Sequence, residues 1–195
     1  MTTQAIAQKR IVSIDKQEGL EVRDLILVAV LLAAGAVLKL TVSSFLTFAG
    51  MKPNFMIAMY CLAIILTRPK VYQSAVIGFI TGLISQIPML NATPLVNIAS
   101  ELVGAVVCGI LLASLTKVAP KTASMQNVVL PAVITFVSTT FSGYTFALVV
   151  GCAMNGLSVP VVLATYAVMV LGTAAMNAIL AAILTPILRK TLKIA

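Results

Sequence analysis

The sequence has no histidine, no tryptophan and few charged residues. Only 9% of its 195 residues are charged and 61% are hydrophobic, with a mean hydropathy of +1.12. Soluble domains carry roughly 25% charged residues, so we predict an integral membrane protein. Four of the five acidic residues precede residue 25. This scarcity excludes the usual metal centres and hydrolases that use a histidine base or paired carboxylates, and no catalytic residue, metal or cofactor is expected.

Three further patterns narrow the function. Cys61, Cys108 and Cys152 lie in or beside apolar runs without CxxC spacing, which predicts small buried side chains. No GxxxxGK[ST] phosphate-binding loop is present, so the chain is not expected to hydrolyse ATP by itself. We interpret the net charge of +8 as the excess of basic residues expected in the cytoplasmic loops of a membrane protein, and not as a nucleic-acid-binding surface.

Six apolar runs follow a polar tail at residues 1–23, in which a short interfacial helix at 11–22 is expected. A bilayer core about 30 Å thick takes about 20 helical residues. The second run is short and needs the loop around Pro53 to complete a span, whereas the sixth is long enough to tilt or project. We predict an all-α membrane protein with one six-helix transmembrane domain, residues 24–195. The runs are 24–42, 54–66, 71–87, 94–115, 128–151 and 160–188.

The basic residues alternate between loops. Eleven of the 13 lysines and arginines fall in the tail, the second loop, the fourth loop and the C-terminus, and the third and fifth loops have none. The positive-inside rule therefore predicts that both termini are cytoplasmic. Lys39 and Lys52 are left for the outer half of the protein. Lys39, near the end of the first run, is interpreted as a snorkelling lysine.

Glu101 is the only acidic residue after Asp24, and it lies inside the fourth run. A carboxylate at such a depth costs about 2.5–3.5 kcal/mol on insertion scales unless it faces protein or water. Asn97 is four residues earlier and shares its helix face. We expect both to line a pocket open to the outside, with Lys52 as the opposite charge. The alternative is a carboxylate paired with Lys39 or a helix end, without a ligand.

Polar residues also repeat on one face of the fifth and sixth runs. Such stripes either bind a ligand or hydrogen-bond neighbouring helices. With the outer loops they would complete a site for a zwitterion with an apolar body, whose ammonium binds Glu101 and whose carboxylate binds Lys52. The predicted site residues are Lys52, Asn54, Asn97, Glu101, Ser142, Tyr144 and Tyr166.

Ala29 and Ala33 form an Ala-x-x-x-Ala motif in the first of the six runs. With this motif the chain resembles the substrate-binding S components of energy-coupling factor (ECF) transporters, whose first helix docks the shared module through such a motif. The stretch Gly-Met-Lys-Pro-Asn at 50–54 and the run at 76–85 are similar to an S-component family assigned to tryptophan transport. That family carries an acid where this chain has Asn54.

The resemblance implies a mechanism and partners. An S component captures its substrate from outside and reorients in the membrane, driven by a transmembrane coupling protein and two cytoplasmic ATPases. The expected location is the plasma membrane of a prokaryote, and the expected substrate is tryptophan or a similar amphipathic nutrient. A vitamin-specific S component and a stand-alone secondary transporter coupled to protons at Glu101 are the alternatives.

Overall fold

The computed structural model describes residues 20–46, 52–87, 90 and 93–193. The interfacial helix expected at 11–22 lies almost entirely outside these residues. The described part of the chain is helical, without strands. Its elements are α1 (Val22–Phe45), α2 (Met56–Thr67), α3 (Val71–Ile84), α4 (Pro94–Val118), the π-helical η1 (Met125–Val129), α5 (Leu130–Leu148), the π-helical η2 (Val149–Met154) and α6 (Val159–Leu192).

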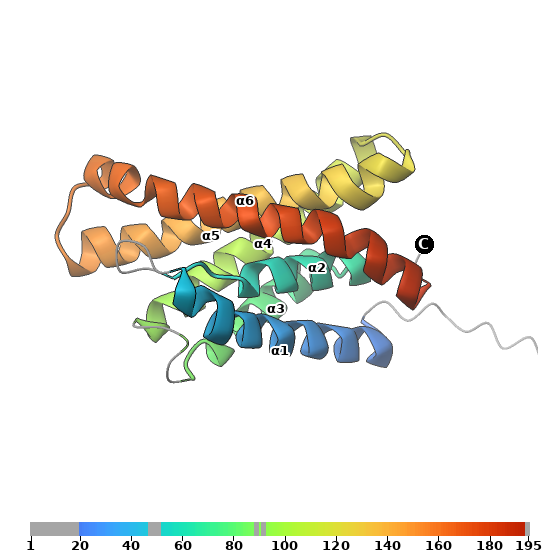
Figure 1. Ribbon diagram of the computed structural model, residues 1–195, viewed down its shortest axis with the longest axis horizontal. Coiled ribbons are helices and arrows are strands. Elements are labelled where there is room, and N and C mark those ends of the chain that lie inside the picture. Colours follow the sequence, from blue (N-terminus) through green and yellow to red (C-terminus); the bar gives the residue numbers. More distant parts are fainter. Residues whose placement is uncertain (1–19, 47–51, 88–89, 91–92, 194–195) are drawn as a thin grey trace, which may run out of the picture.

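Four stretches of helix are long and apolar enough to cross a membrane. They lie roughly along one direction (Figure 1), and they are α1, α4, the continuous η1–α5–η2 segment and α6. The remaining helices have 12 residues (α2) and 14 residues (α3), and α2 therefore rises only about 18 Å. The prediction of an all-helical membrane protein is confirmed. The count of six spans stays a prediction.

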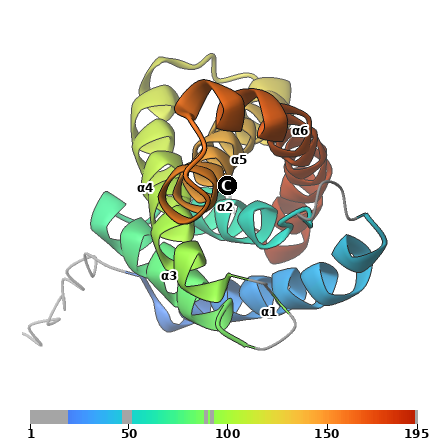
Figure 2. The same ribbon diagram turned by 90° about the vertical axis from the view of Figure 1, so that its left-hand side faces the viewer.

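The short helix α2 occupies the centre of the bundle. Every residue from Met56 to Leu66 is buried, and α2 contacts each of the five other α-helices; Figure 2 shows these helices arranged around it. A helix that is apolar on all sides is stable only where all sides are covered. Cys61 on α2 and Cys108 on α4 are buried as predicted, while Cys152 is half-buried.

Two glycines on one face of α3, Gly78 and Gly82, form its contact with α4. A Cβ added at Gly78 would lie 2.6 Å from the Cβ of Ala105, and one added at Gly82 would lie 2.7 Å from the Cα of Ile98. These distances leave no room for a side chain, so the two backbones approach closely. In contrast, Ala29 and Ala33 on α1 are exposed.

Three arginines lie at one end of the bundle, where the start of α1 meets the end of α6 (Figure 1). A guanidinium nitrogen of Arg23 donates to the carbonyl of Leu192. Nearby on α6, Arg189 donates to the Asn127 side chain at 2.8 Å and lies within electrostatic range of Arg68. The start of α1 and the end of α6 thus lie at the same end of the bundle, as expected for a chain that crosses the membrane an even number of times. Their assignment to the cytoplasm stays a prediction.

Candidate functional site

The non-helical segment before α2 is the centre of a polar network between helices. Nδ2 of Asn54 donates to Oε1 of Glu101 on α4 at 2.5 Å. Nδ2 of Asn177 on α6 donates to the carbonyl of Asn54 at 3.0 Å. From α1, the hydroxyl of Ser43 donates to the carbonyl of Pro53 at 2.6 Å. One short non-helical segment is therefore bound to three helices, which explains why the second apolar run can be so short.

Glu101 is the charged centre of this network. It follows the first residue of α4 by seven positions, or about 10 Å along the axis, and its side chain is 0% exposed. Asn54 satisfies Oε1, but Oε2 has no hydrogen-bond partner among the described residues. A buried carboxylate is costly unless it is paired or fully hydrogen-bonded. The free oxygen of Glu101 is therefore a position at which a cationic group would bind favourably.

The buried cation of the network is Lys39, so its interpretation as a snorkelling lysine is wrong. Lys39 is only 3% exposed and lies within electrostatic range of Glu101. The cause is the packing of α1: Gly35, Lys39 and Ser43 share one helix face, and Gly35 lies directly against α2. Lys52, the predicted counter-charge, is exposed.

The predicted polar faces of α5 and α6 point into the bundle. One pair forms the interhelical hydrogen bond expected of such stripes, from Nδ2 of Asn177 to Oγ1 of Thr139 at 3.3 Å. Other groups have no partner in the described part of the chain, including the hydroxyls of Thr135 and Ser138 and Oδ1 of Asn177. Buried polar atoms without partners call for a bound water, ion or ligand. The buried members are Thr135, Ser138, Thr139, Ser142, Thr173 and Asn177.

Tyr60 is a member of this cluster that the sequence interpretation missed. Its hydroxyl lies against Gly104, where an added Cβ would be 2.1 Å from the hydroxyl oxygen and 2.8 Å from the Cβ of Ser142. The same hydroxyl is close to Glu101. A signal was available, because a buried tyrosine in an apolar helix needs a polar place for its hydroxyl.

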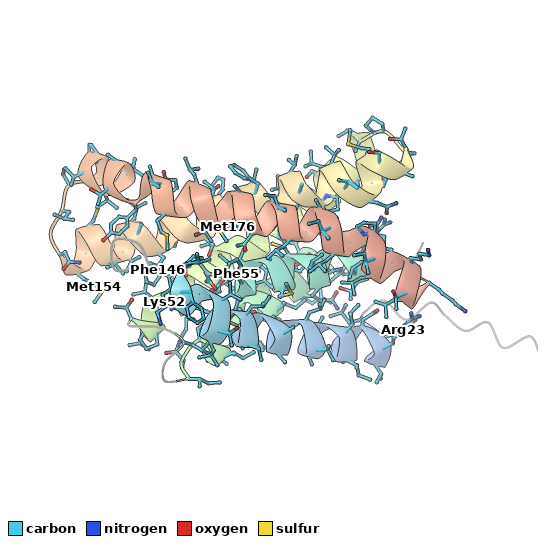
Figure 3. All side chains as sticks on the ribbon, viewed as in Figure 1. Arg23, Lys52, Phe55, Phe146, Met154 and Met176 are labelled. Carbon is cyan, nitrogen blue, oxygen red and sulfur yellow. The ribbon has the colours of Figure 1, made fainter. Side chains whose placement is uncertain are left out.

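The structure does not bring all the predicted residues into this network. Asn97 is buried, and its side chain donates to the carbonyl of Thr93, within its own helix, at 3.4 Å. Tyr144 and Tyr166 are half-buried, and in the described residues no hydrogen bond joins either of them to Glu101. Figure 3 shows the segment that begins at Lys52 set well back from Met154, at the tip of the α5–α6 hairpin. The hairpin therefore extends beyond the polar network at the end opposite to the basic residues.

A hollow of about 330 Å³ lies between α1 and α6. Phe55 and Met176, two of its lining residues, lie near one another in Figure 3. All its lining side chains are apolar, so it offers no hydrogen bond to a charged group. It is therefore distinct from the polar network around Glu101. The lining residues are Leu38, Val42, Phe55, Met176, Ile179 and Leu180.

Comparison with known proteins gives one match. The model of a protein family described as "Tryptophan transporter TrpP" matches residues 21–193, which includes every helix of the bundle. The resemblance to a tryptophan-transporter family, based on residues 50–54 and 76–85, is thereby confirmed. No curated protein and no solved structure matches the chain.

Proposed function

Because the chain belongs to the tryptophan-transporter family TrpP, we propose that it is the substrate-capture subunit of an ECF-type importer. In this role it binds tryptophan from outside the cell and delivers it inward with a separate ATPase module. The observation that supports a capture site most directly is the buried Glu101. Asn54 holds one of its oxygens and the hydroxyl of Tyr60 lies nearby, but the other oxygen has no hydrogen-bond partner within the described ranges. This group lies in the half of α4 that is farther from the basic end of the bundle.

The proposed site is built around Glu101, in the half of α4 that is farther from the basic end of the bundle. A carboxylate there binds the ammonium of an amino acid, and hydroxyl and amide groups orient it. Half-buried aromatic side chains would contact the indole ring. Lys52 would stand at the mouth of the site, where an exposed cation attracts anions but binds them weakly. Its proposed members are Lys52, Asn54, Asn97, Glu101, Ser142, Tyr144 and Tyr166.

The proposed partners are a transmembrane coupling protein and two cytoplasmic ATPases, in the plasma membrane of a prokaryote. Support comes from α1, where Ala29 and Ala33 are exposed and offer a flat surface to another helix. The sequence has no phosphate-binding loop of its own. Energy for uptake would then come from the partner chains.

Two other functions are consistent with the same site. A vitamin-specific S component would use it for a different amphipathic nutrient. A stand-alone secondary transporter would use Glu101 to carry protons, since an intramembrane carboxylate of this kind is typical of proton relays.

Binding and uptake experiments separate these functions. Purified protein should bind radiolabelled tryptophan saturably, and Glu101→Gln should abolish or strongly weaken that binding while the protein still elutes as a single species. Unchanged affinity in this variant would exclude the proposed site. Vesicles that contain this chain alone should not accumulate tryptophan under a proton gradient, whereas vesicles with the co-purified ATPase module and ATP should. Uptake by the chain alone would favour the secondary transporter.

A further inference from the structure

Lys39 and Glu101 are two buried groups of opposite charge that the network leaves incompletely satisfied. Lys39 is 3% exposed and Glu101 is 0% exposed. Each lies in the electrostatic field of the other, yet no hydrogen bond joins them. Among the described residues, Nζ of Lys39 and Oε2 of Glu101 both have no hydrogen-bond partner. Buried charges are normally paired and hydrogen-bonded, because desolvation costs more than a distant opposite charge returns.

The other contacts of Glu101 fix the position of its free oxygen. Asn54 binds Oε1, and Asn54 is itself held by Asn177 through its backbone carbonyl. The position of Lys39 is fixed by α1. Ser43, one turn later on the same face of α1, donates to the carbonyl of Pro53. The two charged groups therefore come from different helices, α1 and α4, which are connected through one short segment.

We infer that Lys39 and Glu101 together bind the zwitterionic head group of the substrate, with Lys39, and not Lys52, as the partner of the carboxylate. This inference rests on the proposed function and assigns the two ends of its site. The ammonium of the ligand donates to the free oxygen of Glu101, and its carboxylate accepts from Nζ of Lys39. A free amino acid carries its ammonium and its carboxylate on the same carbon atom, so one molecule offers a partner to each of the two buried groups.

Selectivity follows from the same arrangement. A ligand with only one charge would satisfy one of the two buried groups and leave the other unpaired, so it would gain much less on binding than a zwitterion. Lys52 cannot impose this selectivity, because it is exposed and water would solvate it whether or not the ligand has a carboxylate. The site should therefore reject amines and acids that share the indole ring of tryptophan.

The test compares three ligands: L-tryptophan, tryptamine, which lacks the carboxylate, and indole-3-propionic acid, which lacks the ammonium. Their affinities are measured by calorimetry on the purified full-length protein. The wild type should bind tryptophan about 100-fold more tightly than either analogue, since one unpaired buried charge is worth at least two powers of ten. Lys39→Gln should reduce the preference for tryptophan over tryptamine to about tenfold or less. Glu101→Gln should do the same for the preference over indole-3-propionic acid.

Lys52→Gln distinguishes the two lysines, and Lys117→Gln, near the C-terminal end of α4, controls for net charge. Lys117→Gln should leave all three affinities unchanged. Lys52→Gln, at the mouth of the proposed site, should weaken the binding of tryptophan by no more than about fivefold, because an exposed charge contributes little, and should keep most of the preference over tryptamine. If Lys39→Gln retains it, or if Lys52→Gln removes it, the assignment to Lys39 is wrong while the proposed function stands. A wild-type protein that binds none of the three ligands would overturn the proposed function, and the two residues would then form a purely structural pair.

A single substitution could fail to fold because it leaves the remaining buried charge alone. The double variant Lys39→Met with Glu101→Gln removes both charges, and such replacements of buried pairs are often tolerated. It should elute as a single species and bind tryptophan and tryptamine with affinities within about tenfold of each other. A folded double variant that still prefers tryptophan by about 100-fold would overturn the inference.

Discussion

Replacing Asn54 by aspartate tests the contact on which the polar network depends. The substitution changes the shape of the side chain little but replaces the amide donor that lies 2.5 Å from Oε1 of Glu101 by a second carboxylate. Loss of a hydrogen bond to a charged group costs about 1.5–3 kcal/mol. Two charges about 4 Å apart would add about 4 kcal/mol of repulsion at an effective dielectric constant of 20. Protonation of one carboxyl limits the total, so we expect a destabilisation of about 3 kcal/mol.

Thermal unfolding of the protein in detergent, followed by size-exclusion chromatography, measures this effect. For a chain of this length the expected loss corresponds to a decrease in Tm of about 6–12 °C. In the double variant Asn54→Asp with Glu101→Gln the amide and the carboxylate exchange places, and most of the loss should be recovered. Asn155→Asp, in the exposed turn between η2 and α6, is the control. It loses a solvent-exposed hydrogen bond to the carbonyl of Val150, which is worth about 1 kcal/mol, so Tm should change by no more than about 4 °C. A Tm equal to that of the wild type for Asn54→Asp, or no recovery in the double variant, would refute the contact.

Two further predictions concern the small residues of the bundle. Gly78→Ala should destabilise the protein by about 1–3 kcal/mol, because the added Cβ would lie only 2.6 Å from the Cβ of Ala105. Gly172→Ala is the control: an added Cβ there meets nothing within 4 Å, so the variant should be neutral or more stable by up to about 1 kcal/mol. Equal thermal stability of the two variants would contradict the packing of α3 on α4. Ala29→Trp should prevent co-purification of the ATPase module without changing the affinity for tryptophan. Ala164→Trp, at an exposed position of α6, is the control and should leave assembly intact. A complete complex with Ala29→Trp would exclude α1 as the docking helix.

Much of the fold could be predicted from the sequence, because the hydropathy of a segment determines whether it forms a membrane helix, and the charges that flank it indicate its orientation. Apolar length identified six helical segments, and all six are helices in the structure. Arg23, Arg68 and Arg189 lie at one end of the bundle, which agrees with the alternation of charge between loops. The central place of α2 could not be derived in this way. It depends on the segment at 52–55 reaching into the bundle, and hydropathy contains no information on that depth.

The site could be predicted only in part. Glu101 was identifiable because an isolated acid in an apolar helix needs a partner. The sequence left Lys52 and Lys39 as two possible partners and could not decide between them, since successive residues of a helix point about 100° apart and the rotation of α1 decides whether Lys39 faces lipid or protein. That rotation is set by the contact of Gly35 with α2. The hydrogen bond from Asn54 likewise depends on non-helical backbone, to which no periodicity applies.

The absence of tryptophan from the chain permits a direct test of the central claim, that this protein binds tryptophan in a buried site around Glu101. Red-edge excitation, which excites tryptophan but not tyrosine, should give almost no emission from the purified protein alone. Addition of L-tryptophan should produce a saturable, blue-shifted emission, because the indole ring moves from water into an apolar environment, and Glu101→Gln should lack this component. A wild-type sample that shows only the emission of free tryptophan at saturating ligand would contradict the claim.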